Sequence, residues 1–69
     1  MRISARNVLP ATVKAVTPGA VDTEVLVELA PGIEMVSLIT KQSAEMLGLK
    51  PGVKAYAIVK ASNVIIGAD

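Results

Sequence analysis

The stretch VDTEVLVELAPGIEMVSLITKQSAEMLG, residues 21–48, decides the fold class. Along residues 21–29, β-branched and aliphatic side chains hold the odd positions, and Asp22, Glu24 and Glu28 hold even ones. This period of two is typical of a half-buried strand. The APG turn that begins at Ala30 then reverses the chain into residues 33–39, so we expect a hairpin.

The residues after this hairpin change in character. Thr40 suits the N-cap position, the residues from Lys41 to Leu47 are mostly good helix formers, and Gly48 suits the left-handed position that follows a helix. The pattern predicts a helix of about two turns.

The segments on either side of this stretch complete the topology. Residues 3–16 are rich in β-branched side chains and end at a Pro-Gly turn, and Pro10 within them predicts an edge position or a bulge. After the helix, a Pro-Gly turn separates it from expected strands at residues 53–61 and 63–68. Three strands, a short helix and two strands predict an all-β fold, a five-stranded OB-like barrel with the helix between strands 3 and 4. We expect one domain over residues 1–69.

Composition predicts that the chain works as an oligomer. Of its 69 residues, 52% are hydrophobic and 19% are charged. A domain of this size buries only ~60% of the surface of its unfolded chain, so one core cannot hide that many apolar side chains. With no cysteine, disulfides cannot stabilise the fold, and association with other copies is the remaining means.

The absence of His and Cys excludes several classes of function. Transition-metal cation sites lack their usual ligands, and Ser-His-Asp or Cys-His nucleophiles cannot form. The acidic residues of 21–29 fit a solvated strand face, so we predict that the protein is not an enzyme. Residues 1–7 contain no signal-peptide core, and no apolar run is long enough for a membrane span, which predicts a cytoplasmic protein.

Two short segments, SARN from Ser4 and KASN from Lys60, have similar composition. Each places a cation and a hydroxyl two residues apart, and on a strand such residues share a face. Ser4 with Arg6, and Lys60 with Ser62, can therefore converge. A guanidinium, an ammonium and hydroxyls together suit a small anion with several oxygens.

The start of the predicted helix offers further donors. Its first turn has unpaired backbone N–H groups, and Thr40 and Ser43 place hydroxyls at the N-cap and third positions. None of these segments contains a carboxylate, so the donors favour a fully deprotonated oxyanion over hydrogen phosphate. The residues do not distinguish sulfate from molybdate or tungstate, and each pair alone also fits a solvated strand end or a helix cap.

Two other functions remain open on the residues alone. An OB-fold module that binds single-stranded nucleic acid uses aromatic platforms in a basic groove, whereas this chain has Tyr56 as its only aromatic residue and a net charge of +1. A structural assembly subunit without a ligand is also compatible with the composition.

Four segments together resemble the molbindins, which are Mop-type molybdate- and tungstate-binding proteins with an OB-like TOBE domain. They are SARN from Ser4, ITKQS from Ile39, LGL from Leu47 and KASNV from Lys60, in matching order and spacing. The resemblance covers essentially the whole chain. It implies a hexamer built as a trimer of dimers, with molybdate bound between subunits for molybdenum storage and homeostasis.

The resemblance also assigns roles by position. One subunit would provide Ser4, Arg6, Lys60, Ala61 and Ser62, with Ala61 acting through its backbone N–H. The neighbouring subunit would provide Thr40 and Ser43. Molybdate or tungstate would be the ligand, with no covalently bound cofactor and no cation site.

Overall fold

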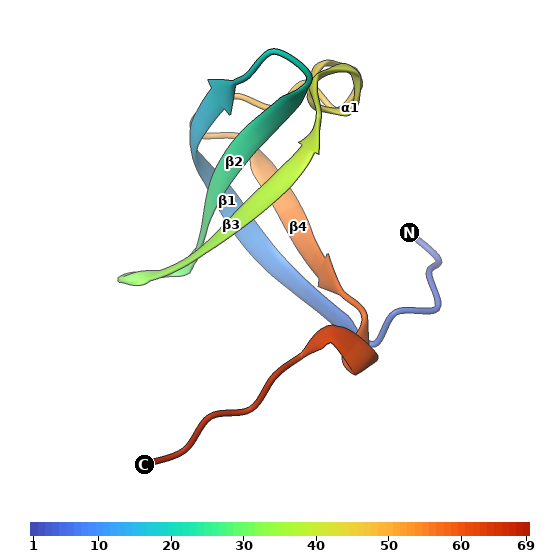
Figure 1. Cartoon of the computed structure of the whole chain (residues 1–69), viewed down its shortest axis with the longest axis vertical. Helices are drawn as coiled ribbons and strands as arrows, with labels where there is room; N and C mark the ends of the chain where they lie inside the picture. The colour runs from blue at the N-terminus through green and yellow to red at the C-terminus, as the bar shows by residue number, and fades with distance from the viewer.

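A four-stranded antiparallel sheet forms the body of the molecule (Figure 1). The computed structural model describes residues 1–69. The strand order in the sheet is β3-β2-β1-β4, and a short helix and a 3₁₀ turn complete the structure. The elements are β1 (Asn7–Pro18), β2 (Asp22–Ala30), β3 (Ile33–Thr40), α1 (Lys41–Met46), β4 (Lys54–Val59) and η1 (Ala61–Asn63).

The alternation along β2 places its odd residues in the core. Thr23, Val25 and Val27 are buried, whereas Glu24 is exposed, as predicted. The core is small, since only 6 of 69 residues are buried. Its four clustered members are Ala11, Val13, Val25 and Val27.

Pro10 occupies the edge position that the sequence predicts. It pairs with Tyr56 of β4, while pairing of β1 with β2 begins only at Thr12. Because β1 does not pair with β2 at residue 10, no hydrogen bond to β2 requires the backbone N–H that Pro10 lacks. Further along β1 the register shifts between Val13 and Ala15, and a bulge of this kind bends and twists a strand. The sheet in Figure 1 is coiled accordingly.

The helix α1 forms where predicted. Thr40 is the N-cap, and the left-handed backbone of Gly48 (φ 64°) ends the helical segment. The Lys41 amide donates to the carbonyl of Val21 (3.1 Å), and Ala44 is buried against the sheet. The helix is thus fixed to the β1–β2 turn.

The expected fifth strand at residues 63–68 is wrong for the single chain. The 3₁₀ turn η1 directs the chain away from the sheet, and the residues after it extend without a ladder partner (Figure 1). The sheet therefore stays open, and the chain alone does not close a five-stranded barrel. Residues 3–6 also lie outside the first strand, which begins at Asn7.

The open sheet leaves an unusually large surface. The accessible surface is 5489 Å², whereas a folded monomer of this mass exposes about 4,100 Å². Much of the excess is apolar. Large apolar side chains that are exposed include Val21, Ile33, Val36, Leu38, Met46, Leu47, Ile58, Val64, Ile65 and Ile66. No helix has the length and hydropathy needed to span a membrane.

Candidate functional site

The two segments that contain the candidate cations lie together at one end of the sheet. Asn7 pairs with Val59 at the end of the β1–β4 ladder, and Arg6 and Lys60 are the next residues beyond this last pair. The Asn7 side-chain amide donates to the carbonyl of Val59 (3.1 Å) and fixes the strand ends next to the two cations. Figure 1 shows the N-terminal segment leaving the sheet beside η1. We call this region the cationic end.

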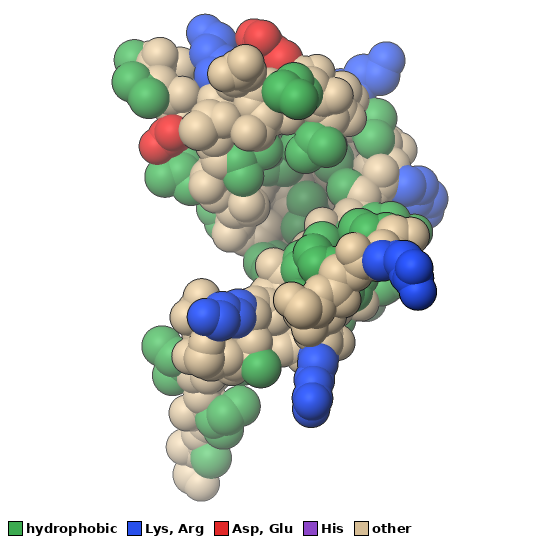
Figure 2. Space-filling model, turned by 90° about the vertical axis from the view of Figure 1, so that its right-hand side faces the viewer, with side chains coloured by type: hydrophobic (Ala, Val, Ile, Leu, Met, Phe, Trp, Pro, Cys, Tyr) green, Lys and Arg blue, Asp and Glu red, His purple; other side chains and the backbone are tan.

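No carboxylate neutralises the cationic end. Arg6 and Lys60 are exposed, and the only ion pair of the chain joins Lys14 to Glu28 (3.6 Å) elsewhere on the sheet. In Figure 2, basic side chains lie on both the upper and the lower half of the molecule, and the acidic ones that are visible lie near the top. Two like charges at the same end of the sheet repel each other, so a bound anion would stabilise this arrangement.

The expected strand geometry of the two basic segments is wrong. Ser4 and Arg6 precede β1, and Ser62 lies in η1. A 3₁₀ helix has three residues per turn, so Lys60 and Ser62 do not share a face as strand residues would. The turn offers backbone donors instead. Its hydrogen bonds run from Asn63 N to Lys60 O (2.9 Å) and from Val64 N to Ala61 O (3.2 Å), which leaves the amides of Ala61 and Ser62 outside them.

The hydroxyls of Thr40 and Ser43 form a local unit at the start of α1. The Ser43 amide donates to Thr40 Oγ1 (3.0 Å), and Thr40 Oγ1 donates to Ser43 Oγ (2.7 Å). The Thr40 proton is therefore occupied within the cap. Ser43 Oγ, which accepts that proton, keeps its own proton for a ligand.

A carboxylate lies beside this hydroxyl pair, which the sequence argument did not anticipate. Asp22 of β2 is the cross-strand partner of Thr40 of β3. We call the end of the sheet beside α1 the helix end. The expectation of donors without a neighbouring carboxylate therefore holds for the cationic end but not for the helix end. The sequence segments around Thr40 contain no acid, and only the strand pairing brings one there.

The two halves of the candidate site lie at opposite ends of the sheet (Figure 1). β1 has 12 residues between the cationic end and the β1–β2 turn beside α1. At ~3.3 Å per residue this corresponds to roughly 40 Å along the strand, far more than one oxyanion spans. A single chain brings Ser4, Arg6 and the residues 60–62 to one end and Thr40 with Ser43 to the other.

Comparison with known proteins establishes the family. A model described as the TOBE domain matches residues 3–66. The chain belongs to the TOBE domain family. Within this family it is similar to molybdenum-pterin-binding protein 3 of Clostridium pasteurianum, with 44% identity over 66 residues that cover 96% of this chain and 97% of that protein. The resemblance to Mop-type proteins is thereby confirmed.

Two further proteins share this TOBE domain as part of a longer chain. The molybdenum-pterin-binding protein MopA of Rhodobacter capsulatus is 47% identical over 68 residues, which are 99% of this chain and 26% of MopA. A structure of the cytoplasmic molybdate-binding protein ModG, with molybdate bound, superposes with a TM-score of 0.93 at 51% identity. It covers 100% of this chain, which spans 49% of that one. All three are named as binding proteins.

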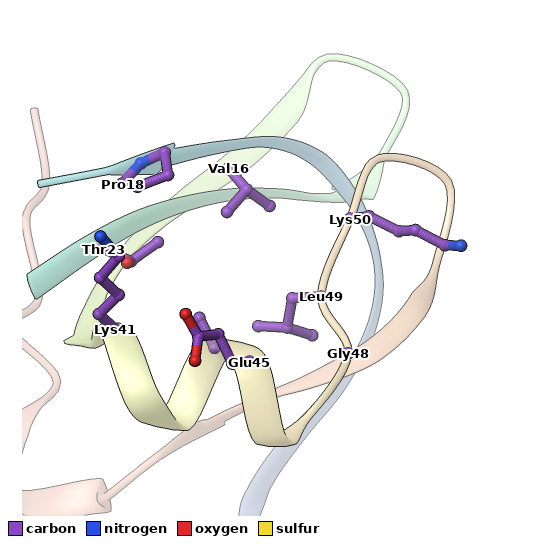
Figure 3. A pocket seen from close by; sticks show the side chains of 9 residues that line it. Val16, Pro18, Thr23, Lys41, Glu45, Gly48, Leu49 and Lys50 are labelled. Atoms are coloured by element: carbon purple, nitrogen blue, oxygen red, sulfur yellow. The ribbon is translucent and has the colours of Figure 1, made fainter.

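This TOBE domain also has a cavity that the sequence did not reveal. It lies between α1 and the ends of β1 and β2 and has a volume of about 470 Å³ (Figure 3). The side chain of Thr23 at its wall is 1% exposed, and its Oγ1 has no hydrogen-bond partner. In the sequence Thr23 is only one of the alternating core positions. The lining residues are Val16, Pro18, Thr23, Lys41, Ala44, Glu45, Gly48, Leu49 and Lys50.

Proposed function

We propose that this TOBE domain binds molybdate, and also tungstate, between copies of the chain in a cytoplasmic homo-oligomer that stores molybdenum. The observation that carries the proposal is the separation of the donors. Arg6 and Lys60 lie at one end of the sheet, and Ser43 lies at the other. The relative ModG has been solved with molybdate bound. Two copies that meet end to end would complete the site that one copy lacks.

The proposed mechanism is capture by charge and hydrogen bonds, without a chemical reaction. Arg6 and Lys60 supply positive charge, and the free amides of Ala61 and Ser62 add donors fixed by η1. Ser43 of the second copy adds a hydroxyl held in place by Thr40. Charge-assisted hydrogen bonds are roughly twice as strong as neutral ones, so the cations provide most of the affinity. Release requires only dissociation of the anion.

The excess surface supports the oligomer. The accessible surface of 5489 Å² exceeds the value for a folded monomer by about 1,400 Å². A standard interface buries about 800 Å² per partner, so the excess is enough for nearly two interfaces per chain. Two kinds of interface are what a hexamer built as a trimer of dimers requires, and this is the assembly that we propose.

The C-terminal segment is the proposed link between copies. Val64, Ile65 and Ile66 follow η1, are exposed, and have no partner in their own sheet. β3 and β4 are the open edges of that sheet. We infer that the segment of one copy pairs as the fifth strand of another, which would close the OB-like barrel that the sequence predicts.

Complementation between two inactive variants tests the intersubunit site. Arg6→Ala and Ser43→Ala remove donors from the two different halves. Each variant alone should bind molybdate weakly in calorimetry. In oligomers reassembled from an equal mixture, about a quarter of the sites should contain both intact halves and bind with normal affinity. Arg2→Ala is the control for loss of a nearby cation and should bind as the unmodified protein does.

A mixture that shows no tight sites would contradict the intersubunit arrangement. Thermal unfolding tests the ligand independently of the arrangement. Molybdate at 100 times its dissociation constant should stabilise the folded state by ~2.7 kcal/mol. Phosphate and sulfate at matched ionic strength are the controls. An absence of any shift with molybdate would favour a structural subunit without a ligand.

The names of several relatives join molybdenum to a pterin. For the cationic end of this chain we propose the bare oxyanion. The only aromatic side chain is Tyr56, which lies on β4 opposite Pro10 and not beside Arg6 or Lys60. A flat ring would find no stacking surface among the donors, and the same argument disfavours nucleic-acid bases. We expect no oligonucleotide shift at low salt.

A further inference from the structure

One side-chain hydrogen bond joins the two basic segments of the chain. Nδ2 of Asn7 donates to the carbonyl oxygen of Val59 (3.1 Å), across a separation of 52 residues in the sequence. The structure has three other side-chain hydrogen bonds, two in the cap of α1 and one at the far end of the β1–β4 ladder. The Asn7 bond is therefore the only side-chain link between the segments that contain Arg6 and Lys60.

This bond acts on the backbone units that adjoin the two cations. The carbonyl of Val59 belongs to the same peptide unit as the N–H of Lys60, and Asn7 follows Arg6 directly. Asn7 and Val59 are the last pair of the β1–β4 ladder, so no further pair holds either segment beyond this point. Because a peptide unit is planar, fixing the Val59 carbonyl also fixes the plane from which Lys60 leaves the sheet.

The same peptide unit sets the start of η1. Lys60 is the N-cap of this turn, with an extended backbone (φ −62°, ψ 131°) and no capping bond from its own side chain. The amides of Ala61 and Ser62 come next, and they lie outside the hydrogen bonds of the turn. The directions of Lys60 and of these two amides therefore depend on the peptide unit that Asn7 holds.

Holding the two cations at one end of the sheet has a cost. Arg6 and Lys60 are exposed, and no acidic side chain pairs with either. Their mutual repulsion favours separation of the strand ends, which the ladder beyond Asn7 does not oppose. Asn7 is half-buried, so its hydrogen bond competes less with water than a fully exposed one would. The bond thus keeps together two segments that charge alone would move apart.

We propose that Asn7 is a positioning residue of the anion site, whose amide holds Lys60 and the free η1 amides in a fixed relation to Arg6. Preorganised donors bind more tightly, because less ordering is required on binding. A fixed set of donors also discriminates by size, and molybdate is a larger tetrahedral dianion than sulfate. Asn7 therefore supports both the affinity for molybdate and its selection over sulfate. This inference rests on the proposed function and adds a residue that does not itself touch the anion.

The test compares two asparagines of the cationic end by calorimetry on the assembled protein. Asn7→Ala removes the hydrogen bond and should weaken molybdate binding about three- to tenfold. Asn7→Gln keeps an amide donor and should recover part of this loss. Asn63→Ala removes an amide from η1 that makes no side-chain hydrogen bond, and should bind as the unmodified protein does. Equal affinities of Asn7→Ala and the unmodified protein would overturn the inference and leave the proposed molybdate site standing.

Selectivity and coupling distinguish positioning from a role in stability alone. Asn7→Ala should lower the affinity for molybdate more than that for sulfate, whereas a loss of stability would leave their ratio unchanged. In double-mutant cycles, Asn7→Ala should have a smaller effect once Lys60→Ala has removed the side chain that it positions, and its full effect beside Ser43→Ala. An unchanged ratio together with additivity at Lys60 would overturn the positioning role. Failure of the unmodified protein to bind molybdate would instead overturn the proposed function itself.

Discussion

The two ends of the sheet are built differently. At the helix end, the turns and caps are satisfied within the chain: the Gly19 amide donates to Asp22 O (2.7 Å), and Thr40 caps α1. At the cationic end, the chain leaves the sheet, and Ile65 and Ile66 are 93% and 84% exposed. The turn and the helix cap at the helix end are therefore formed within one copy, although Val21, Met46 and Leu47 there are exposed, whereas the C-terminal segment at the cationic end has no partner in its own chain.

This difference separates folding from assembly. A Cβ at Gly19 would lie 2.7 Å from the carbonyl oxygen of Asp22, so the β1–β2 turn depends on one glycine and on no partner chain. The C-terminal segment has no such local constraint. Its contribution to stability comes only when its apolar side chains are buried, at about 25 cal/mol per Å². Variants at the two ends should therefore respond differently to dilution.

The largest effect is expected from charging the C-terminal segment. The double change Ile65→Asp and Ile66→Asp should dissociate the oligomer, because each buried isoleucine contributes about 1.5–3 kcal/mol and an unpaired charge cannot replace it. Light scattering coupled to gel filtration should give the mass of a monomer. Ala68→Asp adds a charge to the same segment without removing a large apolar group, and should remain assembled. An intact oligomer in the double variant would show that another surface joins the copies.

The next largest effect concerns the charge at the cationic end. Lys60→Ala should weaken molybdate binding about 10- to 100-fold, because a hydrogen bond to a charged group contributes about 1.5–3 kcal/mol. The oligomer should stay assembled. Lys54→Ala removes an equally charged side chain from the start of β4 and should bind normally. If both variants lose the same affinity in calorimetry, net charge and not the local site determines binding.

Most of the helix end could be predicted from the sequence because its signals are local. The alternation of residues 21–29 fixes which side of β2 faces the core, and Thr40 and Gly48 mark the limits of the α1 segment. Pro10 has no backbone N–H to donate to a ladder, so in any strand it marks an edge position. Each of these features depends on residues close together in the chain.

The cationic end was predicted less well because its geometry depends on long-range placement. The composition of residues 60–68 suits strands, yet η1 interrupts them, and no edge of the same chain receives the residues that follow. The proximity of Asp22 to Thr40 follows from strand register and is invisible in either segment. The unpaired hydroxyl of Thr23 is likewise a property of packing. The resemblance to Mop-type proteins, in contrast, depended on segment order alone and was confirmed.

A smaller effect should follow from removing the cap at the helix end. Thr40→Ala leaves the Ser43 amide without its acceptor, and loss of such a cap costs about 1 kcal/mol. For a domain of this size the melting temperature should fall by about 4–8 °C. The fall should be the same at high and low protein concentration, since the cap lies within one chain. A fall that grows on dilution would show that Thr40 also supports the assembly.

The smallest effect is expected at Asp22, which the strand register places opposite Thr40. Cross-strand partners have Cβ atoms about 4.5–5.5 Å apart, so a dianion held by Ser43 lies near this carboxylate and is repelled by it. Because Asp22 is exposed, solvent and salt screen the repulsion to below about 1 kcal/mol. Asp22→Asn should therefore tighten molybdate binding about two- to fivefold at low salt, and less at high salt. Glu24→Gln removes the same charge two residues further along β2 and should change the affinity less. Equal effects of the two variants would mean that the helix end contributes only a diffuse potential and that Ser43 does not contact the anion.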